Sequence, residues 1–143
     1  MAKKRRSKLA PEQGAGSTRI APPTFKNDVP AEQQPPVFSL EYLQQDYCVT
    51  ACQIEDQAKF ALRLRKLGQL TWSQIQSASR HGLGYEKINR GAIRASIPRH
   101  ITEDVSFIAF RFSALKPMVG YRSGRVFYVI WLDKDFTLYD HGS

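Results

Sequence analysis

Apolar residues follow two different periods along this chain, and the change from one to the other divides it. Between residues 52 and 80 they recur at the spacing of an amphipathic helix. From residue 104 onward they alternate with the period of a strand that buries one face. The pattern predicts an α+β fold in which two N-terminal helices pack on an antiparallel sheet of about four strands.

The first helix is expected over residues 52–67, a run of strong helix formers. Thr50, with Gln53 three residues later, resembles a capping box at its start. The predicted apolar face consists of Ala58, Phe60, Ala61, Leu62, Leu64 and Leu67, and the solvated face carries Lys59, Arg63 and Lys66. The preceding residues 37–47 are short and mixed, and a helix that packs Phe38, Leu40 and Leu43 is one interpretation.

The second helix has a clearer start. Thr71 and Gln74 form another capping-box pattern, and Leu70 with Ile75 supplies the hydrophobic pair that often accompanies it. The helix is expected to end near Gly82, because glycine readily takes the left-handed conformation that ends helices. A connector dotted with glycine and rich in basic residues follows.

The carboxyl half reads as a series of consecutive strands. Residues 105–112 alternate, residues 117–121 follow, and an Arg-Ser-Gly turn then suits a tight hairpin. Residues 125–133 are apolar on both faces, which is typical of a strand covered on both sides. An Asp-Lys-Asp turn returns the chain, so residues 136–141 are expected to form a closing strand antiparallel to it.

The first 36 residues differ from the rest in composition. They contain six of the eight prolines and few large apolar side chains, so burial cannot offset the entropy lost on ordering. We expect residues 1–36 to be a disordered, basic, proline-rich tail and residues 37–143 to form a single α+β domain. The formal charge of +8 divides evenly between the two parts.

Charge and composition favour some classes of protein over others. The basic balance favours an anionic partner such as nucleic acid, and residues 3–8 (KKRRSK) would either anchor a polyanion or only aid solubility. No apolar stretch typical of a signal peptide or a membrane span occurs. Cys48 and Cys52 are too few for a zinc site, and we expect thiols in a protein of the reducing cytoplasm.

The stretch FIAFRFSALKPMVGYRSGRVFYVIWLDKDFTLYDHG, residues 107–142, combines an arginine-bearing strand, a short turn and two further strands. Together with the two helices before it, it resembles the RelE/ParE/HigB-like toxins over residues 50–143. The resemblance implies an endoribonuclease that cleaves mRNA, on the ribosome or free, and an antitoxin protein that neutralises it. In the ParE branch it implies a gyrase inhibitor without nuclease activity. The long basic leader and the lack of an extra helix after the last strand depart from the family pattern.

The expected chemistry is cleavage of RNA by its own 2′-hydroxyl. This reaction needs a base, an acid and cations for the phosphorane charge, and it requires neither a metal nor another cofactor. His141, Arg111 and Tyr139 are the predicted catalytic residues, because Tyr139 and His141 share one face of the predicted closing strand. The predicted RNA-binding residues are Arg122, Tyr121, Lys87, Arg90 and His81.

Each of these assignments has a structural alternative. Arg111 would otherwise form a salt bridge with Asp133 or Asp140, and Asp133 itself looks like a turn former. Tyr139 would otherwise cover the sheet edge, and His81 would otherwise cap the second helix at its C-terminal end. The alternative function is a non-catalytic module that binds nucleic acid or protein, the gyrase-inhibitor type included.

Overall fold

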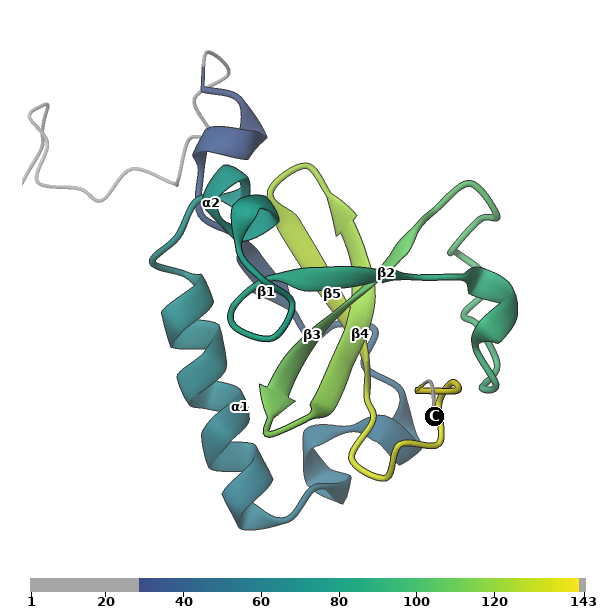
Figure 1. Cartoon of the computed structure of the whole chain (residues 1–143). Coiled ribbons are helices and arrows are strands. Elements are labelled where there is room, and N and C mark those ends of the chain that lie inside the picture. Colours follow the sequence, from purple (N-terminus) through teal and green to yellow (C-terminus); the bar gives the residue numbers. More distant parts are fainter. Residues whose placement is uncertain (1–28, 142–143) are drawn as a thin grey trace, which may run out of the picture.

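The computed structural model describes residues 29–141 and shows an α+β fold built on a five-stranded sheet (Figure 1). The sheet order is β1-β5-β4-β3-β2, in which β1 runs parallel to β5 and all other pairs are antiparallel. The strands are β1 (Val37–Ser39), β2 (Tyr85–Ile88), β3 (Phe107–Ser113), β4 (Lys116–Ser123) and β5 (Val126–Leu132). The predicted fold class is confirmed, with one strand more than expected.

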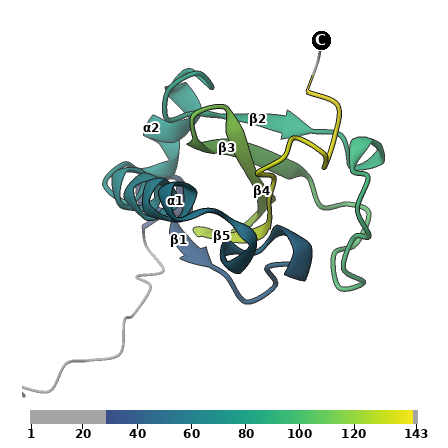
Figure 2. The same ribbon diagram turned by 90° about the horizontal axis from the view of Figure 1, so that it is seen from below.

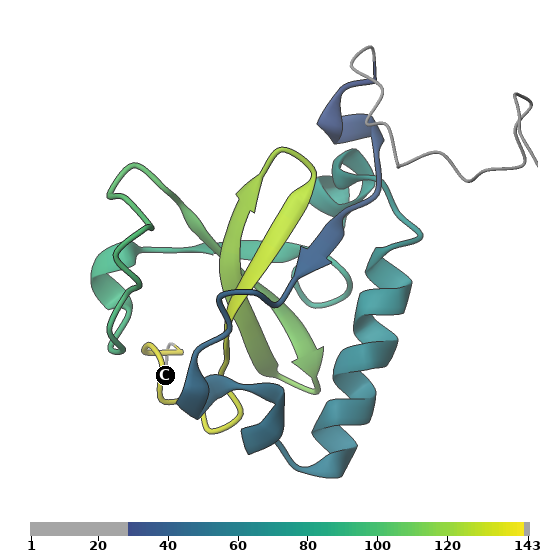
Figure 3. The same ribbon diagram turned by 180° about the vertical axis from the view of Figure 1, so that it is seen from behind.

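The place beside β5 belongs to β1 and not to the C-terminal segment. Phe38 lies opposite Phe127 in this parallel pair, which Figure 3 shows from behind. The helix interpretation of residues 37–47 is therefore wrong, because the first three of them are a strand and the rest form turns. Sequence-local signals could not reveal this pairing, since its partner lies at the other end of the chain.

The predicted closing strand over residues 136–141 is also wrong. After β5, the carboxylate of Asp133 accepts hydrogen bonds from the backbone N–H groups of Thr137 and Leu138, at 2.8 and 3.1 Å. Phe136 has a φ of 58° in this turn, which is incompatible with an extended strand. The segment nevertheless is ordered against the domain, because Leu138 is fully buried and its carbonyl accepts the N–H of Arg94.

The first helix, α1 (Ile54–Leu67), forms close to its expected position. The predicted capping box at Thr50 is wrong: Gln53 is the N-cap, without a side-chain cap, and short 3₁₀ turns at Gln45–Tyr47 and Val49–Ala51 lead into the helix. Its buried face is narrower than predicted. Phe60 and Leu67 are buried, whereas Leu62 is 61% exposed.

The second helix, α2 (Trp72–Ser77), begins at the predicted capping box. The N–H of Gln74 donates to Thr71 Oγ1, and the Gln74 side chain accepts the N–H of Thr71. The helix ends at Ser77 rather than near Gly82, because Ala78 already has extended backbone angles. Within residues 29–141, no helix has both the length and the apolar character needed to cross a lipid bilayer.

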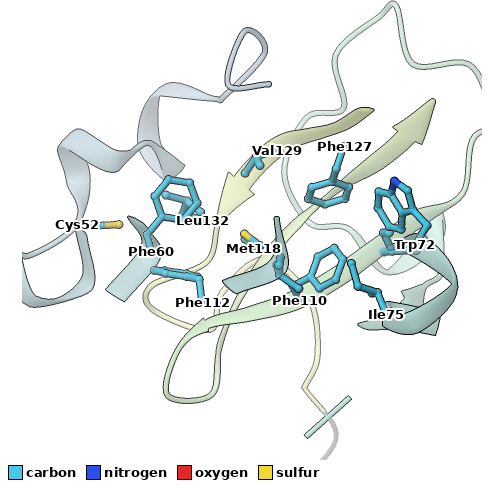
Figure 4. Close-up of a cluster of buried hydrophobic side chains, with 12 residues drawn as sticks. Cys52, Phe60, Trp72, Ile75, Phe110, Phe112, Met118, Phe127, Val129 and Leu132 are labelled. Atoms are coloured by element: carbon cyan, nitrogen blue, oxygen red, sulfur yellow. The ribbon is translucent and has the colours of Figure 1, made fainter. Parts of the chain in front are cut away.

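The sheet has a separate core on each face. Figure 2 shows α1 and α2 on one side of the sheet and the connector with the C-terminal segment on the other. The core under the helices is drawn in Figure 4 and includes Phe60, Trp72, Ile75, Phe110, Phe112, Met118 and Phe127. The second core includes Ile101, Phe107, Ala109, Val119, Ile130, Trp131, Leu138 and Tyr139. Strand β5 is apolar on both faces because it contributes to both cores.

The pairing of β4 with β5 changes register between Val119 and Gly120. A Cβ atom at Gly120 would lie 1.8 Å from the carbonyl oxygen of Tyr128, so only glycine fits there. The shift lets Ile130 and Trp131, neighbours in sequence, both enter the second core.

The part of the predicted tail that the structure describes is packed on the domain. Residues 29–36 include a 3₁₀ turn at Ala31–Gln33, and the carbonyl of Gln34 accepts the N–H of Trp72 at 3.1 Å. The guanidinium of Arg125 donates to the carbonyl of Pro35. The folded unit therefore includes residues before position 37, while the tail predicted over residues 1–28 lies outside the described residues.

Candidate active site

A pocket of about 420 Å³ opens beside the second core. Strands β2, β3 and β4 form its floor, and the segment after β5 forms one wall. Its lining comprises Arg80, Glu86, Ala109, Phe110, Arg111, Leu115, Pro117, Phe136, Tyr139, Asp140 and His141. The three residues predicted to be catalytic therefore line one pocket, although a turn rather than a strand brings two of them there.

Arg111 lies where β3 loses its outer partner. Strand β2 pairs with β3 only as far as Phe110, and Arg111 is opposite Pro117 of β4. Strand alternation places its side chain on the same face as Ala109, the face of the second core. Arg111 is half-buried and has no acidic ion-pair partner in the part of the chain that the structure describes. Its guanidinium thus faces a pocket that Glu86 and Asp140 also line, without a salt bridge to either.

His141 is held by a buried carboxylate. Its Nε2 atom lies 2.9 Å from Oδ2 of Asp133, whose side chain is 0% exposed. An ionised carboxylate only accepts hydrogen bonds, so Nε2 carries the proton in this contact and Nδ1 is left as the basic nitrogen. The predicted salt bridge from Asp133 to Arg111 does not form, because the carboxylate is used by His141 and by two backbone N–H groups.

Tyr139 supports the imidazole from one side. Its ring centroid lies 4.0 Å from that of His141, and Phe136 meets the same imidazole edge-on at 5.2 Å. Tyr139 is only 6% exposed, and burial, with smaller effects from the charges of Glu86 and Asp133, raises the pKa of its phenol far above the ordinary value. The phenol therefore stays protonated near neutral pH, where it can donate a hydrogen bond but cannot act as a base.

An ion pair borders the opposite side of the pocket. Nη1 of Arg80 lies 2.6 Å from Oε1 of Glu86, and the two side chains are 55% and 36% exposed. Glu86 is opposite Ala109 in the β2–β3 pair and so belongs to the same face as Arg111. Tyr85 packs against the helix-side core, so strand alternation places Glu86 on the opposite face. This alternation is the sequence signal that could have predicted Glu86 as a lining residue.

Two of the five residues predicted to bind RNA make contacts within the domain. Arg122 forms a salt bridge with Glu32, donates to the carbonyl of Gly124, and lies 4.2 Å over the ring of Trp72. Arg90 donates to the carbonyls of Ile101 and Thr102, at 2.8 and 2.6 Å. Those donors hold the chain in place, and neither side chain lines the pocket.

The other three predicted RNA-binding residues also lie outside the pocket. Tyr121 stacks on Tyr128 with centroids 5.0 Å apart, and its hydroxyl contacts Nε2 of His100 at 3.1 Å. Lys87 is exposed on β2. His81 is exposed in the loop after α2, so it does not cap that helix, which has already ended at Ser77.

Potential metal ligands are sparse where the structure can be described. Between residues 29 and 141, no three His, Cys, Asp or Glu side chains gather closely enough to hold a metal ion. Cys52 is a buried free thiol, and Cys48 is a half-buried one.

The chain was compared with protein-family models, curated proteins and solved structures, and none of them matches it. Membership of the RelE/ParE/HigB-like toxins therefore stays a prediction. Its structural basis is the succession of α1, α2 and three antiparallel strands, which the fold does contain.

Proposed function

We propose that this protein is an endoribonuclease that cleaves RNA through attack of a 2′-hydroxyl on the adjacent phosphate. One observation carries the proposal: an imidazole held by the buried carboxylate of Asp133 shares a pocket with a protonated phenol and an unpaired guanidinium. These groups are the base, donor and cation that the reaction requires.

Each group has a distinct task in this reaction. Nδ1 of His141 accepts the proton of the 2′-hydroxyl while Asp133 stabilises the imidazolium that forms. The new bond joins the 2′-oxygen to phosphorus, and the bond to the 5′-oxygen breaks. Arg111 stabilises the negative charge of the phosphorane, and the phenol of Tyr139 donates its proton to the departing 5′-oxygen. The proton taken up by His141 then restores the phenol. The expected products are a 2′,3′-cyclic phosphate and a 5′-hydroxyl.

Within this proposal the protein is a toxin of the RelE/HigB kind. Its substrate is mRNA, on the ribosome or free, and its activity is restrained by an antitoxin protein. The net charge of +8 and the order of helices and strands support this assignment. The toxin assignment is tested by expressing the protein in growing cells. We expect growth arrest that requires His141 and that co-expression of a neighbouring small reading frame relieves.

The chemical proposal is tested by incubating single-stranded mRNA with purified protein, with and without ribosomes and with a chelator present. We expect His141→Ala and Arg111→Ala each to lower the cleavage rate about 10²- to 10⁴-fold. His81→Ala is the matched control, because that histidine is exposed outside the pocket. Cleavage no faster than with the Arg111→Ala, His141→Ala double variant, in either condition, would refute the enzyme.

The second candidate is a binding module without catalysis, and one observation favours it. The three hydrogen bonds that Asp133 accepts also close the C-terminal segment, a structural role that would keep His141 in place without any reaction. This candidate predicts RNA binding that His141→Ala leaves intact and no strand cleavage. The gyrase-inhibitor form predicts blocked supercoiling with intact RNA.

A further inference from the structure

A second hollow with basic walls lies between α1 and the end of β3. It measures about 200 Å³ and is lined by Lys59, Leu62, Arg63, Lys66, Phe112 and Ala114. Lys59, Arg63 and Lys66 recur at spacings of four and three, so they project from one side of the helix. The two lysines are exposed and Arg63 is half-buried.

This hollow lies beside the candidate active site at the end of β3, on the opposite face of the sheet. Phe112 lines the hollow and Arg111, its neighbour, lines the active-site pocket. Strand β2 no longer covers β3 at these two positions, and α1 contacts β3 (Figure 1). The free edge of β3 therefore lies between the two sites.

Arg63 lies at this junction. Its Nη1 donates to the carbonyl of Gly82 at 3.0 Å, which orients the guanidinium toward the loop that follows α2. Burial, and to a smaller extent the positive charge of Arg111, lowers the pKa of Arg63. The two guanidinium groups are thus near neighbours of like charge.

The cations along this path have no acidic ion-pair partners. None of Lys59, Arg63, Lys66 and Arg111 forms a salt bridge with an acidic residue between positions 29 and 141. Like charges that lie together without salt-bridge partners favour an anionic ligand. Exposed apolar side chains border the path, with Leu62 and Leu115 61% and 60% exposed, and such surfaces suit the faces of unpaired bases.

We infer that Lys59, Arg63, Lys66 and Arg111 form a basic track that binds the phosphates of single-stranded RNA and leads the strand over the edge of β3 into the active-site pocket. The inference rests on the proposed function and specifies how its substrate is held. Lys59 and Lys66 are about 10 Å apart along the helix axis. That distance matches about three stacked nucleotides of one strand. The position of this track next to the proposed RNA-cleaving pocket favours RNA over an acidic protein as the occupant.

The test measures binding of a fluorescent single-stranded RNA oligonucleotide in which every 2′-hydroxyl is methylated, so that cleavage cannot occur. Affinity is measured by anisotropy over a range of salt concentrations. The track variant is Lys59→Gln, Lys66→Gln. The matched control is Arg94→Gln, Arg99→Gln, which removes the same charge from exposed connector positions outside both hollows.

We expect the track variant to lose about one unit of slope in log affinity against log salt, because each phosphate contact on a single strand contributes roughly 0.7. Its affinity should fall about tenfold at moderate salt. The control should change less than about twofold, since it alters only the long-range field.

Binding of polyglutamate is measured in parallel as a model of an acidic protein. Three results would overturn the track: unchanged RNA affinity in the track variant, an equal loss of RNA affinity in the control, or loss of polyglutamate binding in the track variant with RNA binding unchanged. The last result would identify an acidic protein as the occupant. The methylated RNA separates this inference from the enzyme, because it cannot be cleaved. The track requires the loss of affinity in the Lys59→Gln, Lys66→Gln variant whether or not the parent protein cleaves natural RNA.

Discussion

Among residues 29–141, each face of the sheet contains one buried carboxylate, and the two are satisfied in different ways. On the helix side, Asp56 accepts hydrogen bonds from the hydroxyl of Ser113 and the ammonium of Lys116, both at 2.7 Å. On the other side, Asp133 accepts two backbone N–H groups and the imidazole of His141. The first carboxylate is neutralised by a fixed cation, whereas the second holds a group that can gain and lose a proton.

The difference follows from what covers each face. Helices cover one face with aromatic side chains, and Asp56 ties the first turn of α1 to the β3–β4 hairpin. Irregular segments cover the other face, and a pocket opens beside them. Their backbone N–H groups are not paired within a helix or sheet, so they need side-chain partners such as Asp133. We expect the helix face mainly to supply stability and, within the proposed function, the opposite face to supply the chemistry. The following predictions test that division in order of decreasing effect on stability.

The largest loss of stability is expected for Trp72→Ala on the helix face. Trp72 is fully buried against Phe110 and Phe127, and its indole N–H donates to the carbonyl of Arg125. Its removal should lower the free energy of unfolding by about 3–5 kcal/mol, measured by urea denaturation. Leu62→Ala, which truncates an exposed side chain, is the control. An equally small loss of unfolding free energy in both variants would contradict the stabilising role of the helix face.

A loss of about 2 kcal/mol is expected for Asp56→Asn, because a charge-assisted bond to Lys116 is removed. The bonds from Lys116 and Ser113 hold the pKa of Asp56 below its ordinary value. This stabilisation is therefore complete above the ordinary aspartate pKa of about 4 and is lost as the pH falls through the lowered folded value.

The measurement for Asp56 is the free energy of unfolding between about pH 2 and 6, the range in which aspartates titrate. Asp56→Asn should flatten the acid side of the curve, while Asp135→Asn, at an exposed position, should leave its shape unchanged. An unchanged acid slope in the Asp56 variant would show that this carboxylate does not contribute to acid unfolding.

A smaller loss, about 1 kcal/mol, is expected for Asp133→Asn, because an amide keeps one acceptor for the backbone donors. Faster hydrogen exchange should appear at the amides of Thr137 and Leu138. Cleavage should fall roughly 10²-fold, since the imidazole of His141 loses the carboxylate that orients it. Unchanged cleavage with faster exchange would assign Asp133 a purely structural role.

The smallest change in stability is expected for Tyr139→Phe, which keeps the ring contact with His141. The free energy of unfolding should change by less than about 0.5–1 kcal/mol, while cleavage should drop about tenfold through loss of the hydroxyl donor. Equal binding of the methylated RNA by both proteins is the control. Wild-type cleavage in this variant would remove the phenol from the proposed chemistry.

Much of the fold could be predicted from local patterns. Periodicity located α1 and the three strands from β3 to β5, and the pairing of Thr71 with Gln74 marked the start of α2. The missed strands are short or distant from their partners. β1 has only three residues and pairs in parallel with β5, and β2 lies inside the glycine-dotted connector.

The candidate site was predicted in part. Arg111, Tyr139 and His141 do line one pocket, but the predicted strand that was to align two of them is a turn. The reason is Asp133, which looked like a turn former in the sequence and in fact captures the backbone donors that a strand would have paired. Burial of an acidic side chain depends on distant segments, so sequence spacing alone could not indicate its role.

The pairing of β1 with β5 has a consequence for folding kinetics. The hydrogen bond from Arg125 to Pro35 beside this pair links residues 90 positions apart, whereas β3, β4 and β5 are joined by short hairpins. Forming so large a loop costs more chain entropy than closing a hairpin, and contacts of high sequence separation slow folding. We expect the hairpins to assemble first and this parallel edge to join the sheet late, as the rate-limiting event.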